Sequence, residues 1–317
     1  MARSTSVDPA RRDAPGRLAL SPAARGIAFL ITAVALFAVF NVLLKHLADR
    51  FAPSQLVFIR GLVGLLPLAA LLALDGGGRR VLISSRPWLQ VIRALSAFLA
   101  NVLMVTSYRF MPLADAVAIS YAAPIFVTAL SVPLLGERVG WHRWAAVALG
   151  FVGVLLVARP GQGVIDPMAG VAVLGALCYA VCILATRELG GRDAALTTML
   201  WSTGLFAVFG ALTLPVVGTA PAWSEVPLLG LSGLVATAGM FFFVRAYREA
   251  EASTVVPFEY TAMIWAAAFG FLVFGEVPRP TTLAGIAVIA GSGLYILRRE
   301  TRIRRAGPAT PTGPRAR

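Results

Sequence analysis

Histidine and cysteine are scarce in this chain of 317 residues, which contains two of each. Cys178 and Cys182 are one helical turn apart within an apolar run, and no histidine or further cysteine completes a metal-ligand set beside them. His46 and His142 lie between apolar runs. The sequence also lacks a G-x-x-x-x-G-K-[ST] phosphate loop. These absences argue against a bound metal or cofactor, a Ser/His hydrolase and direct drive by ATP.

Charged residues are also few, at 14% of the chain, whereas hydrophobic residues make up 58% and the mean hydropathy is +0.79. An ordinary soluble domain has about 25% charged residues, so this composition indicates an integral membrane protein whose main partner is the lipid bilayer. The formal charge of +13 does not indicate nucleic acid, because 12 of the 28 Lys and Arg residues lie in the two terminal segments 1–25 and 298–317 and most others lie between apolar runs.

Ten apolar runs are each close to the roughly 20 residues that an α-helix needs to cross a bilayer. Backbone groups in lipid must be satisfied within the segment, so the runs are predicted to be helices. They cover residues 26–44, 54–74, 88–107, 113–135, 141–158, 168–186, 195–217, 223–247, 254–274 and 280–297. The fold class expected is therefore an all-α membrane protein with ten transmembrane helices. Residues 1–23 and 299–317 are predicted to be disordered tails, and 159–167 a connector between two sets of five spans.

The basic residues predict the orientation of these spans. When both tails and alternate loops are assigned to one side, that side holds 21 Lys and Arg residues and the other holds five, with Arg60 and Arg93 inside spans. Cytoplasmic loops are enriched in Lys and Arg, so both termini are predicted to be cytoplasmic and the connector 159–167 periplasmic.

The stretch 108–159 occurs twice in the chain. A shift of 139 positions places Tyr108 on Tyr247, Tyr121 on Tyr260 and Glu137 on Glu276, and gives 13 identities in 52 positions without a gap. Residues 24–158 and 168–298 are therefore predicted to be two homologous repeats. Five spans per repeat is an odd number, so the repeats cross the membrane in opposite directions. Inverted repeats of this kind are a recurrent design of secondary transporters.

Several motifs resemble the paired EamA domains of the drug/metabolite transporter superfamily. They are Phe58-Ile59-Arg60-Gly61, Tyr121-Ala122-Ala123-Pro124 and Leu135-Gly136-Glu137 in the first repeat, with Pro257-Phe258-Glu259-Tyr260 and Phe274-Gly275-Glu276 in the second. The resemblance covers about residues 24–298 and implies a ten-helix, proton- or gradient-linked carrier of small metabolites in a bacterial inner membrane. The second repeat departs from the first because its region 198–202 has no counterpart of Arg60.

Three ionisable residues inside the predicted spans are candidates for chemistry: Arg60, Arg93 and Glu259. A charge at a helix centre costs about 2.5–3.5 kcal/mol, so such residues usually face a cavity or each other. Arg93 and Glu259 lie at matching depths from the same side in opposite repeats, and they are expected to meet as a static or a functional ion pair, or to reach the interface separately. Glu259 is the candidate for proton coupling, and Arg60 for substrate binding or anchoring.

Tyr121 and Tyr260 occupy equivalent positions, one residue after Ser120 and Glu259. They are expected either to line a cavity from both sides or to pack in the core, and Ser120 is included in the candidate site.

Asn41, Asn101 and Trp265 complete the candidate substrate site. The two asparagines either bond across helices or touch substrate. Trp265 suits a planar or amphiphilic metabolite, such as a vitamin or an amino-acid derivative.

Other features have structural interpretations. Glu137 and Glu276 follow a glycine at span ends, where the amides of a helix N-terminus stabilise a carboxylate. Pro124 and Pro257 are expected to permit kinks. Close packing of helices is expected at four glycines, Gly150, Gly153, Gly291 and Gly293.

The function expected is a secondary transporter of a small molecule, with a homodimer as one assembly considered. A non-transporting receptor or scaffold and an intramembrane enzyme are the alternatives.

Overall fold

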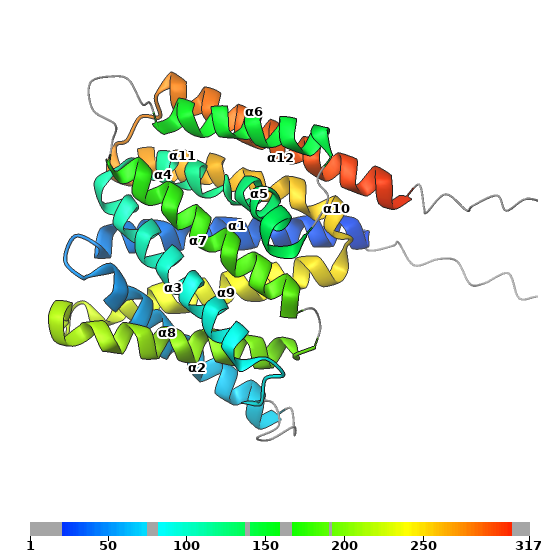
Figure 1. Ribbon diagram of the computed structural model, residues 1–317. Coiled ribbons are helices and arrows are strands. Elements are labelled where there is room, and N and C mark those ends of the chain that lie inside the picture. Colours follow the sequence, from blue (N-terminus) through cyan, green and yellow to red (C-terminus); the bar gives the residue numbers. More distant parts are fainter. Residues whose placement is uncertain (1–20, 75–81, 137–139, 159–166, 190–191, 306–317) are drawn as a thin grey trace, which may run out of the picture.

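The computed structural model describes residues 21–74, 82–136, 140–158, 167–189 and 192–305, and this part of the chain is built from helices (Figure 1). Their bounds are α1 (Pro22–Leu47), α2 (Pro53–Leu74), α3 (Pro87–Phe110), α4 (Leu113–Ser120), α5 (Ala123–Leu135), α6 (Trp141–Ala158), α7 (Pro167–Leu189), α8 (Ala195–Val217), α9 (Val226–Glu249), α10 (Ala252–Val255), the 3-10 helix η2 (Val256–Tyr260), α11 (Thr261–Phe274) and α12 (Pro280–Arg305). Most of the predicted tails and connector, and Glu137, lie outside the described residues.

These elements form ten spans, five in each repeat, which confirms the predicted fold class. Eight helical segments in the described part are long and apolar enough to cross a membrane, and α6 and α12 contain the shorter apolar stretches Trp144–Ala158 and Pro280–Tyr295. In Figure 1, α1 begins and α12 ends at one end of the bundle, whereas α6 ends and α7 begins at the opposite end. The two repeats therefore run in opposite directions.

The C-terminal helix is longer than the sequence predicts. α12 continues to Arg305, although residues from 299 onward are predicted to be a disordered tail. Arg and Glu are good helix formers, and neither proline nor glycine occurs between Leu297 and Arg305. Charge alone does not end a helix.

Two predicted spans are broken near their middle. Residues 113–135 are expected to form one helix, but α4 ends at Ser120 and α5 begins at Ala123, with Pro124 in its first turn. Residues 254–274 are divided by η2, which has Pro257 in its first turn. Proline lacks an amide hydrogen and disfavours helix in the preceding residue, so each break follows from the local sequence. The breaks occupy equivalent positions in the two repeats.

The repeated Gly-Glu pair ends a helix in each repeat. Gly136 and Gly275 have φ angles of 67° and 68°, a left-handed conformation that glycine adopts without steric cost. At the second of these, the Gly275 amide donates to Phe271 O and the Glu276 amide to Gly270 O, both at 3.0 Å, which satisfies the last carbonyls of α11.

The largest helix–helix contacts all join one repeat to the other. They pair α1 with α9, α3 with α7, α6 with α12 and α2 with α8. The symmetry that relates the two repeats interchanges the α1–α9 pair and the α3–α7 pair. It maps the α6–α12 pair and the α2–α8 pair each onto itself. Neither repeat therefore forms an independent core, and the centre of the molecule is the interface between them.

Small residues allow this close contact. A Cβ atom added to Gly153 would lie 2.8 Å from Ile289 Cγ1 and 3.1 Å from Gly285 O, and one added to Gly150 would lie 2.3 Å from Ile125 Cδ1. The predicted packing role is confirmed for these two glycines. It is wrong for Gly291, which has open space where a Cβ would lie.

Candidate substrate site

The two helix breaks meet at the interface between the repeats. Tyr121 follows the end of α4, and its hydroxyl donates to the backbone carbonyl of Glu259 in η2 at 2.9 Å. The rings of Tyr121 and Tyr260 lie with their centroids 5.6 Å apart. Broken helices expose polar backbone groups within the bilayer, and such groups are tolerated where protein or a cavity covers them. This juxtaposition places irregular backbone, two phenols and a carboxylate together.

Glu259 lies in η2 and is half-buried. Its carboxylate accepts a hydrogen bond from the hydroxyl of Tyr247 on α9. Among the described residues, no basic side chain lies within ion-pair distance of it. The carboxylate is held in place by a neutral partner.

Arg60 lies on α2 and is also half-buried. Its Nη1 donates to Asn101 Oδ1 at 2.9 Å, and its guanidinium lies 5.1 Å from the ring centroid of Phe40 on α1. Asn101 in turn donates from Nδ2 to Ala97 O at 2.7 Å. The guanidinium has five donors, so this environment leaves donors for another ligand. No carboxylate in the described part of the chain forms an ion pair with Arg60.

The structure does not bring Arg93 and Glu259 together. Arg93, only 7% exposed, donates from Nη2 to Thr198 O at 2.7 Å and to the Ser202 hydroxyl, both on α8. Its Nε donates to Gln90 Oε1 at 3.0 Å. The expected ion pair is therefore corrected: Arg93 does join the two repeats, but through neutral oxygen atoms of α8.

The other predicted site residues have local roles. Ser120 donates back to Val117 O at 2.7 Å. Trp265 stacks on Phe269 with centroids 5.7 Å apart and packs against an apolar cluster of α1, α9 and α10. Asn41 is half-buried on α1, and its side chain makes no hydrogen bond with the described residues. Of these three, Asn41 and Trp265 keep a polar group, the carboxamide and the indole N–H, that makes no hydrogen bond with the described residues.

Tyr179 on α7 is a residue that the sequence argument misses. It is 50% exposed, while its neighbour Ala180 is fully buried. Its phenol is close enough to Arg60 and Glu259 for a long-range electrostatic interaction, but it forms neither a hydrogen bond nor an ion pair with them. Its counterpart in the first repeat at the shift of 139 is Phe40, which has no hydroxyl, so the repeat does not draw attention to this position.

A scan against family models matches the EamA-like transporter family over residues 24–159 and 167–298. These ranges cover both five-span repeats and nearly all of the chain between the tails. The chain belongs to the EamA-like transporter family. It is therefore a membrane transporter and not an enzyme, which removes the enzyme alternative.

Named relatives of this EamA-like transporter match it over almost the whole of their own length. The S-adenosylmethionine uptake transporter of Rickettsia prowazekii (strain Madrid E) is 24% identical over 89% of this chain and 95% of its own. The riboflavin transporter of Rhizobium johnstonii is 29% identical over 90% and 95%. The pseudopaline exporter CntI of Pseudomonas aeruginosa (strain UCBPP-PA14) is 27% identical over 83% and 93%. A solved crystal structure matches with a TM-score of 0.58 at 18% identity, covering 87% of this chain and 98% of that one, and so shares the fold.

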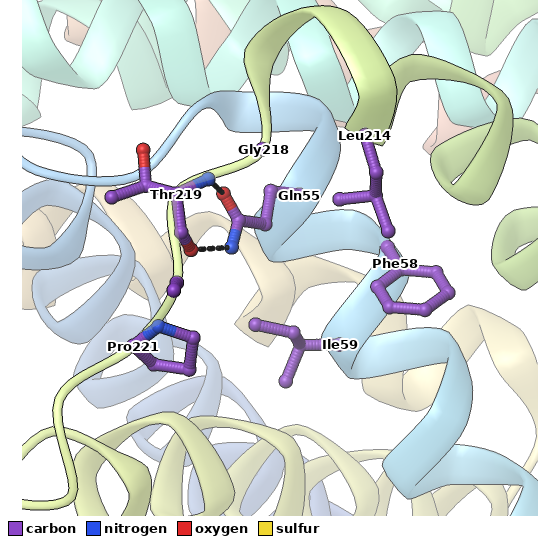
Figure 2. Close-up of a pocket in the computed structure, with 8 residues that line it drawn as sticks. Gln55, Phe58, Ile59, Leu214, Gly218, Thr219 and Pro221 are labelled. Carbon is purple, nitrogen blue, oxygen red and sulfur yellow. Dashed lines mark hydrogen bonds between the residues drawn. The ribbon is translucent and has the colours of Figure 1, made fainter.

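A surface pocket between α2 and α8 is a poor candidate for the substrate site of this EamA-like transporter. It is lined by Gln55, Phe58, Ile59, Leu214 and residues 218–221 (Figure 2). The carboxamide of Gln55 donates to Thr219 O at 2.6 Å and accepts from Thr219 N at 2.9 Å. Both of its polar atoms are used by backbone, so the pocket offers mainly apolar surface.

Polar contacts join the repeats at the end of the bundle where α1 begins and α12 ends. Asp193, between α7 and α8, accepts from the Ser84 hydroxyl, from Ser85 N at 2.8 Å and from Gln90 Nε2 at 2.9 Å. Partial desolvation opposes ionisation, but these hydrogen bonds prevail and hold the pKa of the Asp193 carboxyl below its ordinary value. Because Gln90 also contacts Arg93, the cluster is continuous with the α8 contacts of Arg93.

Replacing Asp193 by asparagine should lower stability at pH 7 by about 1–2 kcal/mol, after discounting for its exposure. A depressed pKa contributes stability above the unfolded value of about 3.9, and that contribution is lost as the pH falls through the folded value. The difference between parent and Asp193→Asn should therefore be largely kept from pH 7 to pH 4 and shrink as the pH falls from 4 toward 2. Thermal unfolding in detergent measures it, with the exposed Asp49→Asn as control. An unchanged difference at pH 2 would contradict the role of the ionised form.

Proposed function

We propose that this protein is a secondary active transporter of a small amphiphilic metabolite, working by alternating access between its two repeats. The observation that carries the proposal is the meeting of the two broken helices, where Tyr121 of one repeat bonds to Glu259 of the other. Substrate sites of inverted-repeat transporters are typically formed by discontinuous helices at the repeat interface. The printed names of the relatives, S-adenosylmethionine, riboflavin and pseudopaline transporters, support a metabolite-sized substrate.

The rocking motion follows from how the repeats contact each other. Every large helix contact crosses the interface, so a rotation of one repeat against the other changes the access to the centre without unfolding either. The residues at the breaks, Tyr121, Glu259 and Tyr260, then stay near the pivot. A substrate held there is exposed to one side of the membrane at a time.

Glu259 is the coupling group in this proposal. It is the acid in the second repeat where the first repeat has Ser120, so one carboxylate serves each transport cycle. The Tyr247 hydroxyl bonds to the carboxylate when it is ionised, and the bond weakens when the carboxyl takes up a proton. Proton uptake on one side and release on the other then links substrate movement to the proton gradient.

The test is transport by Glu259→Gln in proteoliposomes, with labelled S-adenosylmethionine and riboflavin as probes. Glutamine keeps the size and hydrogen bonding of the side chain but has no titratable proton. The variant should insert normally and exchange substrate at equal concentrations, but lose accumulation driven by a pH gradient by at least tenfold.

The exposed Glu251→Gln serves as the matched control and should behave as the parent. Glu259→Gln vesicles that accumulate substrate against its gradient with the parent's pH dependence would rule out Glu259 as the coupling group. Failure of the parent to move either probe would contradict the proposed substrate class.

The proposed location is a bacterial inner membrane with both termini in the cytoplasm. A reporter fused after Arg305 should then give a cytoplasmic signal, and the same reporter inserted in 159–167 should give a periplasmic one. The expectation rests on the excess of 21 over five basic residues. Alkaline phosphatase and fluorescent protein fusions measure the two sides. A cytoplasmic signal from the insertion would reverse the assigned orientation or remove the five-plus-five topology.

A further inference from the structure

We propose that Lys45 and Glu276 form the gate that closes one end of the transport path, and that the structure is the state open at the other end. The closed end is the one where α6 ends and α7 begins, called here the connector end. The open end, where α1 begins and α12 ends, is called the terminal end (Figure 1). The inference rests on the proposed alternating access and names the residues that govern it.

The first halves of the two broken spans differ in burial. α4 lies at the connector end, and seven of its eight residues are buried. Its counterpart at the shift of 139 is the segment 252–259, in α10 and η2 at the opposite end of the bundle (Figure 1). None of the five residues of η2 is buried. Because the repeats are inverted, two opposite access states exchange the surroundings of these segments. The burial therefore indicates that the connector end is closed around α4 and the terminal end is open beside η2.

The apolar core has the same asymmetry. One continuous cluster with members from both repeats fills the bundle from its middle to the connector end. Toward the terminal end the described residues form two smaller clusters that lie apart. One joins α1, α9 and α10 through Leu30, Val34, Ala246 and Val255, and the other joins α3 and α7 through Leu89, Ala185 and Leu189. This is the arrangement expected when the helix pairs α1–α9 and α3–α7 are parted at the terminal end.

The polar contacts at the terminal end do not close it. Arg25 pairs with Glu249 at 3.0 Å, which joins α1 to α9, and Arg86 pairs with Glu188 at 2.7 Å, which joins the start of α3 to α7. The Asp193 cluster joins the start of α3 to the start of α8. Each ion pair thus lies within one helix pair, and no ion pair between described residues bridges the two pairs at this end.

An ion pair joins the two repeats at the closed connector end. Lys45 at the end of α1 is 9% exposed, and its Nζ lies 2.5 Å from Glu276 Oε1 and donates to Met111 O at 2.8 Å. Glu276 Oε2 accepts from the amide of Leu113, the first residue of α4, at 2.8 Å, and a helix N-terminus favours a carboxylate. Glu276 directly follows α11 and its cap, and α11 packs on α4. Parting α11 from α4 at this end therefore breaks both contacts of Glu276.

The opposite state has no equivalent of this ion pair. The counterpart of Lys45 at the shift of 139 is Leu184 on α7, a buried residue without charge. A gate formed at the terminal end by exchange of the repeats therefore lacks the cation. The ion pair stabilises the state closed at the connector end over its opposite, so its loss should shift the population toward the state open at the connector end.

Cysteine labelling at equivalent positions measures the two ends. Val117 of α4 is 3% exposed and Val256 of η2 is half-buried, and the two are counterparts at the shift of 139. Each is replaced by cysteine in detergent-solubilised protein with Cys178 and Cys182 replaced by alanine. Val256→Cys should react with a water-soluble maleimide, and Val117→Cys should react at least about tenfold more slowly. Equal rates, or an unreactive Val256→Cys, would overturn the assigned state.

Lys45→Met, introduced beside each cysteine, tests the gate. The rate at Val117→Cys should rise at least about tenfold and the rate at Val256→Cys should fall at least about twofold, because the population moves to the opposite state. Unfolding exposes both positions, so it cannot give shifts of opposite sign. Glu276→Gln breaks the same ion pair and should give the same shifts. It is the measurement if Lys45→Met fails to fold.

Arg109→Met is the matched control at the same end of the bundle. Its ion pair with Asp49 lies within the first repeat, so both labelling rates should stay as in the parent. Rates that stay unchanged in Lys45→Met and Glu276→Gln, or that rise together at both positions, would leave the ion pair a structural role only and overturn the gate. The labelling needs no substrate and no proton gradient. A failure of either transport probe or of the Glu259→Gln experiment would leave it unaffected, so the two proposals fail separately.

Discussion

Replacing Lys45 by methionine should destabilise this transporter by about 3–5 kcal/mol, the loss expected when one partner of a buried ion pair is removed. Lys45, at the end of α1, is 9% exposed. Its Nζ lies 2.5 Å from Glu276 Oε1 and 2.8 Å from Met111 O, and Glu276 Oε2 accepts from the Leu113 amide at 2.8 Å. Methionine keeps the length of the side chain, so the loss reports on the charge and not on packing.

A double-mutant cycle separates the ion pair from its surroundings. Lys45→Met with Glu276→Gln should be less destabilised than the sum of the single variants, because the double variant leaves no buried charge uncompensated. Arg109→Met is the matched control. Its ion pair with Asp49 at 3.9 Å is exposed, so the variant should lose no more than about 1 kcal/mol. Strictly additive losses at Lys45 and Glu276 in thermal unfolding would show that the pair does not act as a unit.

Gly285→Leu should prevent α6 and α12 from packing and lower the yield of folded protein severely. A Cβ atom at this position would lie 2.5 Å from Val157 Cγ2 and 2.8 Å from the backbone oxygen of Gly153. A side chain rotates away from a clash, but a backbone atom of a packed helix does not. Overpacking of this kind costs about 1–3 kcal/mol or more.

The matched control for Gly285 lies on the same helix. No neighbouring atom of the described residues lies within 4 Å of the position that a Cβ atom of residue 291 would occupy. Gly291→Leu should therefore behave as the parent. Size-exclusion chromatography and thermal unfolding of the detergent-solubilised variants measure the difference. Equal behaviour of the two leucine variants would mean that the helix crossing at Gly153 and Gly285 tolerates separation.

The sequence predicts those features that depend on position along the chain. The number of spans follows from the lengths of the apolar runs. The opposite directions of the two repeats follow from the odd number of spans in each repeat. The helix breaks follow from Pro124 and Pro257, although the sequence suggested only kinks. The predicted stabilisation of Glu276 by helix amides is also present, but the amide belongs to Leu113 of the opposite repeat and not to the next helix. A residue count gives the depth of a side chain in the membrane, and these features need nothing more.

The partners of buried charges depend on how each helix is rotated about its axis. Arg93 and Glu259 are at matching depths, but α3 turns Arg93 and Gln90, three residues apart on one face, toward α8. Each residue turns a helix by about 100°, so an apolar run that is hydrophobic on all sides leaves its rotation undetermined. Tyr179 escaped notice for the same reason, because its importance comes from its neighbours and not from its own sequence context.

The pairing of helices across the repeats has a consequence for synthesis. α1 emerges from the ribosome at residue 22 and its main partner α9 is complete only at residue 249. At about 5–20 residues per second, this delay is roughly 10–45 seconds. During that time the faces of α1, α2 and α3 that contact the second repeat, with Arg93 among them, lack their final neighbours. Assembly in the cell therefore depends on what shields the nascent first repeat, lipid or an insertion chaperone, until the second one arrives.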